Sequence, residues 1–457
     1  MSTSSGLVWF RRDLRLSDNP AWAAATSTHE RVTALYVLDD RLLATAGPAR
    51  RAQHLAELHA LDASLREHGG RLLVRRGEPE KVVPEVAAEL GAPQVHWNAD
   101  VTPAAQRRDT AVREAVEVEP DTWWGHLVLP PGSIRTGEGH VPKVFGAFHR
   151  RWASSTWPEW PDPGDATLGD DEGDGLPHLD ADPPRVPGEV AAQDALARFV
   201  QDEVESYPEG RDEVWRDATS GLSVALRFGT ISPRQVVEAA GTGTPARDAF
   251  TRQLAWRDWY AHLLFERPDM VRSAVRPEYD RIGWRDDPEG LEAWKEGRTG
   301  FPLVDAGMRE LAATGAMHNR VRMVTASFLV KDLLIDWRAG ERHFRRLLVD
   351  ADVPQNVGNW QWVAGTGPDA APYFRVFNPI TQSRQHDPKG EYLRRWVPEL
   401  APLDDRTIHA PWEGGPLEVA AAGVELGRDY PLPIVDHPEA RRRAIAAYEA
   451  ARHGIER

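Results

Sequence analysis

The sequence predicts an N-terminal α/β domain, with a parallel sheet flanked by helices, followed by an all-α domain. Three observations predict this fold class. The chain has 457 residues, which is longer than one typical hydrophobic core supports. Short apolar runs alternate with helical patterns up to about residue 135, as in a parallel sheet covered by helices. From about residue 190 onward the patterns are long and helical, and strand-like runs are few.

Four apolar runs in the first part predict strands. They are "LVWF" from Leu7, "VTALYVL" from Val32, "RLLV" from Arg71 and "VHWN" from Val95. The segment "RRAQHLAELHALDASLREHGG" predicts a helix that ends at the Gly-Gly pair, because its leucines recur on one face. These leucines are Leu55, Leu58, Leu61 and Leu65. A ligand of such a domain is expected beyond the carboxyl ends of the strands.

An acidic segment follows the α/β pattern. Residues 158–184 contain nine acidic residues and no Lys or Arg, with proline and glycine throughout. This composition is typical of a solvated linker. We therefore place an α/β domain at residues 1–135, a linker at 136–200 and a helical domain at 201–457. Two long helices of the last are predicted from "DAFTRQLAWRDWYAHLLFE" and "AMHNRVRMVTASFLVKDLLIDW".

The composition excludes several kinds of chemistry. Cysteine is absent, which excludes disulfides, thiolate nucleophiles, Cys-ligated zinc and iron–sulfur clusters. Redox chemistry would therefore need a bound organic cofactor or aromatic side chains. No two histidines have the spacing of a helical zinc motif, and we expect no metal site. The sequence shows neither a secretory signal nor an apolar run long enough to cross a membrane, so we expect a cytoplasmic protein without a membrane partner.

The charge distribution leaves a polyanionic partner open. The net charge is −15, but the acidic linker accounts for part of it, and DNA binding depends on local cation density. Residues 308–346 are rich in cations. These are Arg309, Arg320, Arg322, Lys331, Arg338, Arg342, Arg345 and Arg346. Two interpretations stay open for them, a basic binding face and a salt-bridged helical surface.

Two helical stripes combine polar and aromatic side chains where a packing face would be aliphatic. The first comprises Gln253, Trp256, Arg257 and Tyr260, at positions i, i+3, i+4 and i+7, beside a separate apolar stripe of Leu254, Ala261 and Phe265. The second comprises Asn319, Arg322, Met323 and Ala326. Aromatic rings, amides and arginines suit a flat, polar ligand that carries phosphate. The spacing alone indicates a pocket for a large flat cofactor or a nucleobase.

Four stretches resemble the cryptochrome/photolyase family, and most resemble the class I cyclobutane pyrimidine dimer photolyases of bacteria. They are "VWFRRDLRLSDNPAW" from Val8, "TSGLSVALRFGTISPRQ" from Thr219, the segment from Gly297 to Trp337, and "GNWQWVAGTGPDAAPYFRVFNP" from Gly358. The resemblance covers nearly the whole chain except the acidic linker. It implies an N-terminal antenna domain, a helical domain that binds FAD, and a monomeric enzyme that acts on DNA containing pyrimidine dimers.

The resemblance also implies which residues hold the cofactor. The residues expected to contact or flank FAD are Tyr207, Arg211, Thr219, Ser220, Gly221, Leu222, Ser223, Phe250, Gln253, Arg257, Arg322, Asp350, Asp352 and Asn356, with Asn356 facing flavin N5. Backbone amides and hydroxyls of "TSGLS" can satisfy phosphate oxygens, although the same stretch is also typical of a simple helix N-cap. A neutral amide can tune the protonation of a flavin.

The resemblance implies different roles for the two tryptophans of "NWQW". Trp360 would begin a chain of three indoles, continued by Trp337 and Trp284, that carries an electron from the surface to photoexcited FAD. Trp362 would form a wall of the lesion pocket opposite Trp256, and we expect an extended segment that directs the two indoles to opposite sides. The other lesion contacts implied are Arg257, Asn319 and Met323. Base flipping of this kind is described for photolyases generally.

The lesion type is indicated by α-helical contacts that match the family. Asn319 and Met323 match the dimer-specific photolyases, whereas the (6-4) enzymes carry histidines in this segment.

Two departures from the family pattern bear on the activity. Gln253 replaces the glutamate that is usual in the bacterial pattern, and an amide can donate a hydrogen bond but cannot supply a proton. This replacement keeps open a cryptochrome-like blue-light photoreceptor with weak or no repair. A flavoprotein oxidoreductase that works without light would leave the three indoles unexplained. "QSRQHDPKGEY" departs as well, with Gln385 and His386 where a Lys-Phe pair is commoner.

The resemblance implies a second, light-harvesting chromophore. Folate-binding photolyases carry a glutamate where this chain has Ala104 and Ala105. The segments "GPARRAQHL" and "WNADVTP" are similar to those of deazaflavin-binding photolyases. We therefore expect 8-hydroxydeazaflavin rather than methenyltetrahydrofolate, and the residues implied near it are Phe10, Arg11, Arg51 and Asp100.

Overall fold

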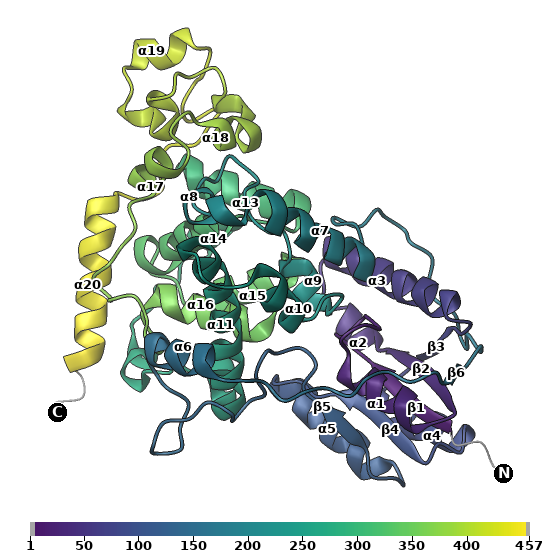
Figure 1. Ribbon diagram of the computed structural model, residues 1–457. Coiled ribbons are helices and arrows are strands. Elements are labelled where there is room, and N and C mark those ends of the chain that lie inside the picture. Colours follow the sequence, from purple (N-terminus) through teal and green to yellow (C-terminus); the bar gives the residue numbers. More distant parts are fainter. Residues whose placement is uncertain (1–4, 454–457) are drawn as a thin grey trace. The chain divides into compact units, whose positions relative to one another are not determined.

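The computed structural model describes residues 5–453 (Figure 1). The chain divides into two compact units, each built from two segments: Met1–Glu205 with Ser220–Pro268, and Ser206–Thr219 with Asp269–Arg457. The segment 206–219 thus belongs to the second unit although both of its neighbours along the chain belong to the first. The domain ranges expected from composition are contiguous and stay predictions.

The first unit contains a parallel sheet with the strand order β3-β2-β1-β4-β5. Its strands are β1 (Ser5–Phe10), β2 (Arg31–Leu38), β3 (Leu72–Arg76), β4 (Gln94–Asn98) and β5 (Asp121–Trp123), and a short β6 (Thr167–Leu168) pairs with β2. The four strands predicted from apolar runs are confirmed. Strands β5 and β6 were not predicted, because three and two residues are too short for a recognisable alternation.

Helices cover this sheet and join its strands. They are α1 (Pro20–Thr28), α2 (Asp40–Leu43), α3 (Pro48–Glu67), α4 (Pro79–Glu89) and α5 (Pro103–Ala115). The helix predicted from its leucine stripe is confirmed as α3, which buries Leu58, Leu61 and Leu65. Helices α4 and α5 pack side by side, and their valines share a core with Trp9 and Trp97 of the sheet. Since the strand order reverses between β1 and β4, the carboxyl ends of these two strands mark the ligand-binding edge typical of such sheets.

The acidic side chains of residues 158–184 are exposed, but part of the backbone of this segment pairs with the sheet; its assignment as a linker stays a prediction. Strand β6 lies inside the segment, and the backbone of residues 169–174 forms hydrogen bonds with the outer edge of β3, including Val74 N to Glu172 O at 3.2 Å. Two of its carboxylates form ion pairs: Glu172 with Arg71 at 2.6 Å, and Asp170 with Arg31 at 3.4 Å. The arginines of the neighbouring strands therefore hold the segment on the sheet.

The remaining helices of the first unit follow the sheet in sequence. They are α6 (Phe145–Ser154), α7 (Glu189–Asp202), α9 (Ser223–Phe228), α10 (Pro233–Ala240) and α11 (Pro245–Glu266). Helix α11 confirms the first predicted long helix. Thr244 caps it by accepting a hydrogen bond from Arg247 N, and proline occupies its first turn. Of its predicted apolar stripe, Leu254 and Ala261 are buried but Phe265 is 37% exposed.

Among the residues that the structure describes, the regular elements of the second unit are helices, joined by irregular segments. Its α-helices are α8 (Tyr207–Gly210), α12 (Pro288–Lys295), α13 (Pro302–Thr314), α14 (Asn319–Ser327), α15 (Trp337–Leu347), α16 (Val353–Ala364), α17 (Pro379–His386), α18 (Glu391–Trp396), α19 (Pro416–Ala421) and α20 (His437–His453). The single long helix predicted from Ala316 to Trp337 was wrong. Helix α14 passes into a π-helical turn, η4 (Phe328–Asp332), and Leu334 has a φ of 54° before α15 begins.

The cation-rich run from Met308 to Arg346 is mostly a salt-bridged surface. Arg309 pairs with Glu399, Arg320 with Asp212, Arg322 with Asp350 and Arg338 with Asp280. Lys331 is buried instead, with Nζ donating to Ala364 O at 3.0 Å and lying 3.5 Å from the Tyr448 ring. Most of these cations therefore neutralise carboxylates of the same unit. Within residues 5–453, no helix combines the length and the apolar character needed to cross a membrane.

Candidate functional site

A cavity of about 510 Å³ lies within the second unit between α14, α15 and α16. The predicted site residues that line it are Asn319, Arg322, Met323, Ala326, Asp350, Asp352, Asn356 and Trp360. The second predicted stripe is therefore confirmed as one wall. This volume includes space that is open to solvent, and the lining of the cavity mixes amides, an ion pair and an indole. Such a lining suits a flat polar ring.

An ion pair forms one side of the cavity. Arg322 donates from Nη2 to Oδ2 of Asp350 at 2.9 Å and from Nε to the Met317 carbonyl at 2.8 Å. The other carboxylate oxygen, Oδ1 of Asp350, is buried without a hydrogen-bond partner among the described residues. A buried acceptor without a partner is costly. The arrangement therefore fits a ligand that brings an N–H donor, such as the ring nitrogen of a flavin.

A second hydrogen-bonded pair fixes the amide that the resemblance places at flavin N5. Asn356 donates from Nδ2 to Glu341 Oε1 and to the Glu341 carbonyl, both at 3.0 Å. Because both donor hydrogens are used there, the amide oxygen is the group left to interact with a ligand in the cavity. Burial raises the pKa of Glu341, while Arg345 acts in the opposite direction. Glu341 was not predicted as a site residue.

Trp360 lies on α16 and packs against two aromatic rings. Its ring centroid lies 5.0 Å from that of Phe344 and 6.2 Å from that of Trp294, both in edge-to-face arrangements. The extended segment expected for "NWQW" was wrong, because these residues belong to the helix Val353–Ala364. In a helix, successive residues are rotated by about 100°, so Trp360 and Trp362 face different sides. Trp360 is 2% exposed, whereas Trp362 is half-buried and does not line the cavity.

Gln361 between them explains how this helix is held. Its side-chain nitrogen donates to the carbonyls of Met270 and Ser273 at 2.8 and 3.0 Å, and its oxygen accepts from Val275 N at 3.0 Å. A fully buried amide with three such bonds fixes the rotation of α16. The two indoles are thereby kept on their separate faces.

The other two tryptophans of the implied chain also lie in the second unit. Trp337 is the first residue of α15 and is 1% exposed, with the Arg338 guanidinium 4.7 Å from its ring. Trp284 is half-buried, and its ring centroid lies 6.2 Å from that of Tyr448 on α20. Their role in electron transfer stays a prediction.

The first predicted stripe lies on α11 of the first unit. Trp256 is half-exposed, and Phe145 of α6 stacks on one face of it at 3.7 Å between centroids with 12° between the planes. Arg257 is buried and donates to the carbonyls of His126 and Leu226. Gln253 donates to the Ala249 carbonyl at 3.1 Å, one turn earlier. The stripe therefore presents an indole and an amide, while Arg257 bonds to the backbone at His126 and in helix α9.

Several other residues implied to contact FAD are divided between the two units. Tyr207, Arg211 and Thr219 belong to the second unit, and Ser220, Gly221, Leu222, Ser223 and Phe250 to the first. Thr219, Gly221 and Ser223 are exposed, and Gly221 has a φ of 64°. Phe250 is buried against Phe199. No side chain of "TSGLS" caps α9, whose first residue is Ser223, so the N-cap interpretation is wrong.

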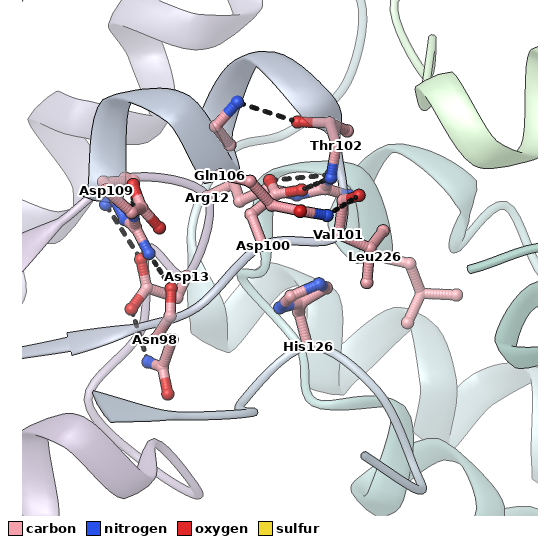
Figure 2. A network of polar contacts seen from close by, with 12 residues as sticks. Arg12, Asp13, Asn98, Asp100, Val101, Thr102, Gln106, Asp109, His126 and Leu226 are labelled. Carbon is pink, nitrogen blue, oxygen red and sulfur yellow. Dashed lines mark hydrogen bonds and ion pairs between the residues drawn. The ribbon is translucent and has the colours of Figure 1, made fainter. Parts of the chain in front are cut away.

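The ligand-binding edge of the sheet carries a network of charged and polar residues (Figure 2). Arg12, after β1, pairs with Asp100, after β4, at 3.3 Å, and Asp100 also accepts from Thr102 N at 2.8 Å. Burial acts to raise the pKa of Asp100, but Arg12 and its other partners lower it overall. Of the other residues expected at an antenna, Phe10 is fully buried, Arg11 pairs with Asp109, and Arg51 is exposed on α3.

Comparison with known proteins assigns both halves of the chain. Residues 6–164 match the DNA photolyase family model, and residues 250–450 match the model for the FAD binding domain of DNA photolyase. A deoxyribodipyrimidine photo-lyase of Agrobacterium fabrum is 40% identical, with 99% of each chain covered. One from Escherichia coli is also 40% identical and covers 98% of this chain and 99% of its own. The chain belongs to the photolyase/cryptochrome family.

Solved structures of the family agree with this photolyase/cryptochrome fold. A bacterial class III photolyase from Agrobacterium tumefaciens is 40% identical, covers 99% of this chain and 98% of its own, and has a TM-score of 0.90. A Synechocystis cryptochrome is 30% identical over 98% of this chain and all of its own, with a TM-score of 0.89. An archaeal photolyase from Sulfolobus tokodaii with two FAD molecules is 33% identical at the same coverages, with a TM-score of 0.85. The family therefore includes both enzymes and cryptochromes of this fold.

Sequence reasoning missed three residues that shape the cavity of this photolyase/cryptochrome protein. Gly340, Glu341 and Phe344 lie on the buried face of α15 with Trp337. Their spacing of i, i+3, i+4 and i+7 is the helical signal that could have found them. A glycine and a glutamate on such a face are atypical of a plain core, and both contact residues of α16.

Proposed function

We propose that the protein is a deoxyribodipyrimidine photo-lyase, which uses blue light to split cyclobutane pyrimidine dimers in DNA. The observation that carries the proposal is the lining of the cavity in the second unit, where the Arg322–Asp350 ion pair lies together with Asn356 and Trp360. This is the constellation expected around a flavin in the family. The similarity to two photolyases over nearly the full length of this chain and of each relative supports the same conclusion.

The cofactor proposed for this cavity is FAD, which supplies the light-driven electron when it is bound in its reduced form. Asp350 would accept a hydrogen bond from the ring through Oδ1, and Arg322 would hold that carboxylate in place through its bond to Oδ2. Asn356 would present its amide oxygen to the ring, because Glu341 holds its nitrogen. Thr219, Ser220, Gly221 and Ser223 would supply hydroxyls and backbone N–H groups to the phosphates.

The lesion would be recognised by aromatic stacking and amides. Trp256 offers the indole surface that Phe145 leaves uncovered, and Trp362 offers a second half-buried indole. Stacking of a base on an aromatic ring contributes roughly 1–3 kcal/mol, which offsets the few kcal/mol of unstacking that flipping requires. Asn319 and Met323 would contact the dimer from α14, and Gln253 from α11.

A chain of indoles would restore the reduced state of the flavin in light. We propose that Trp284, Trp337 and Trp360, in this order, pass an electron inward to the flavin. Their positions in one unit, with Trp360 at the cavity and Trp284 half-buried, support this order. Such a chain needs no cysteine and no metal, which accords with the composition.

A second chromophore is proposed at the sheet edge of the first unit. The carboxyl ends of β1 and β4 bring Arg11 and Asp100 to the edge where parallel sheets bind ligands. We propose 8-hydroxydeazaflavin there, near Phe10, Arg11, Arg51 and Asp100. Reconstitution with this compound or with methenyltetrahydrofolate, followed by excitation spectra of repair, distinguishes the two. Sensitised repair with the folate alone would contradict the assignment.

A repair assay tests the proposed function. The purified protein with reduced FAD is mixed with a thymine-dimer oligonucleotide under blue light, and recovery of thymine absorbance is followed against a dark control. We expect recovery only in light. Asn319→Ala with Met323→Ala serves as a matched variant that should bind FAD and repair poorly. A bound, photoreducible flavin without any repair would favour a blue-light photoreceptor, and Gln253→Glu would then be the variant to examine.

A further inference from the structure

One face of α15 supports the functional residues of α16. The buried residues of α15 are Trp337, Gly340, Glu341 and Phe344, which share one face, and the two helices pack along their length. Glu341 holds Asn356, and Phe344 packs edge-to-face on Trp360. The fourth residue, Gly340, lies one turn after Trp337. Glu341, Phe344 and Gly340 therefore contact Asn356 or Trp360. Trp337 is itself part of the implied electron path.

The absence of a side chain at Gly340 is required by Trp360. A Cβ at this position would lie 2.6 Å from Cζ3 of Trp360 and closer still to Cη2, and 2.6 Å from Cδ2 of Leu329, whereas ordinary contact begins at 3.4 Å. The backbone itself does not need glycine here, because the φ of Gly340 is outside the left-handed region. Glycine in a helix interior is otherwise unfavourable relative to alanine. Its presence is explained by the indole that occupies the space.

We infer that Gly340 is a positioning residue of the electron path, which lets the Trp360 indole lie directly against α15 one turn from Trp337. This inference rests on the proposed function of Trp360 and Trp337. Electron transfer slows steeply as the gap between donor and acceptor edges widens, so a small displacement of the indole has a large kinetic effect. Trp360 also lines the cavity, so the position of its indole bears on the space that the flavin is proposed to occupy.

The test compares photoreduction in four proteins: wild type, Gly340→Ala, Trp360→Phe and the double variant. Each is loaded with oxidised FAD and illuminated with an external reductant, and the loss of oxidised-flavin absorption is followed. We expect Gly340→Ala to slow photoreduction relative to wild type, because displacement of the Trp360 indole changes the gap that the electron crosses between Trp337 and Trp360. Repair by the chemically reduced protein should be retained. Arg346→Ala, an exposed change on the same helix, is the matched control and should behave as wild type.

The double variant separates a positioning effect from general damage. Phenylalanine lacks the outer edge of the indole, so it leaves room for a Cβ at position 340. We expect Gly340→Ala to lower Tm and FAD content less in the Trp360→Phe background than in wild type. This holds even where Gly340→Ala alone fails to retain FAD. Equal losses in both backgrounds would overturn the inference, because the Cβ would then act on Leu329 or on the helix itself.

The remaining outcomes distinguish the inference from the function on which it rests. Photoreduction abolished in Trp360→Phe but unchanged in Gly340→Ala would overturn the role of Gly340 and leave the electron path intact. Photoreduction unchanged in Trp360→Phe would overturn both, since Trp360 would not carry the electron. Slow photoreduction in Gly340→Ala with normal repair after chemical reduction supports the inference.

Discussion

The side-chain amide of Asn356 donates both of its hydrogens to one residue, Glu341, through Oε1 and the backbone carbonyl at 3.0 Å each. These two hydrogen bonds determine which end of the amide can interact with a ligand. We expect Glu341→Ala to remove the bond to Oε1 but not the bond to the backbone carbonyl, to loosen the orientation of the amide and so to shift the visible absorption of bound FAD. The lost hydrogen bond to a carboxylate should lower the free energy of unfolding by about 1–3 kcal/mol.

Glu341→Gln is the matched control for this change. It keeps an acceptor oxygen for Asn356 but removes the charge, so it should restore the absorption spectrum more than the unfolding free energy. Absorption spectra and denaturant titrations of both variants measure this. A normal spectrum in Glu341→Ala would show that Asn356 does not need Glu341 to meet the flavin.

Trp256 is expected to act on damaged DNA specifically. Trp256→Ala should weaken binding to a dimer-containing duplex by about 1–3 kcal/mol, the value of a lost stacking contact, while binding to undamaged duplex changes little. Fluorescence titrations with both duplexes check this. Phe145→Leu removes the ring that stacks on Trp256 but keeps the indole, and it should have the smaller effect. Equal weakening for both duplexes would mean that Trp256 is a structural residue.

Gln253 should limit the efficiency of repair. Its amide nitrogen is engaged by the Ala249 carbonyl at 3.1 Å, and an amide cannot supply a proton to a reacting lesion. A glutamate could not donate to that carbonyl and would be free to interact with the dimer. We therefore expect Gln253→Glu to raise the yield of repair per absorbed photon, and Gln253→Ala to lower it. Identical yields in all three proteins would place residue 253 outside the lesion contacts.

Acid should destabilise the first unit through a buried pair of histidines. His96 lies 3.0 Å from His29, between their Nε2 atoms, and 3.1 Å from Asp121. Burial lowers the pKa of His96 to about 4, against 6.5 in an unfolded chain. The unfolded state therefore binds more protons between these values, so stability contributed by neutral His96 is complete above pH 6.5 and is lost as pH falls toward 4.

The size of this effect can be measured by comparing pH profiles. At about 1.4 kcal/mol per pKa unit, the contribution of His96 is on the order of 3 kcal/mol. His96→Asn should therefore flatten the fall of unfolding free energy between pH 6.5 and 4 relative to wild type, as followed by urea denaturation. Parallel profiles for the two proteins would contradict the assignment to His96.

The sequence predicted the cavity wall of α14 better than its surroundings. Asn319, Arg322 and Met323 repeat with a helical period, and local periodicity is enough to place them on one face. The π-helical turn at 328–332 and the positive φ of Leu334 have no such local signal, because they depend on packing against other helices. The same local reasoning therefore joined α14 to α15 in error.

The "NWQW" segment shows a different limit. Two aromatic residues among glycines and amides resemble a strand or a loop when judged by composition, and the helix Val353–Ala364 was missed. The anchoring of Gln361 on residues 270–275 comes from distant parts of the chain. The contact between Gly340 and Trp360 is of the same kind, since the helical spacing places Gly340 on the buried face of α15 but does not show which residue of another helix it meets.

The acidic segment that lies along β3 also affects how copies of this chain meet. The outer edge of a sheet offers unpaired N–H and C=O groups to any strand that approaches, which promotes aggregation. Here Gly169 and Glu172 accept from Arg71 N and Val74 N, and Asp174 donates to Val74 O. The edge is thus already occupied, and the carboxylates around it repel a second, equally acidic copy. A segment read from its composition as a spacer therefore protects the sheet against self-association.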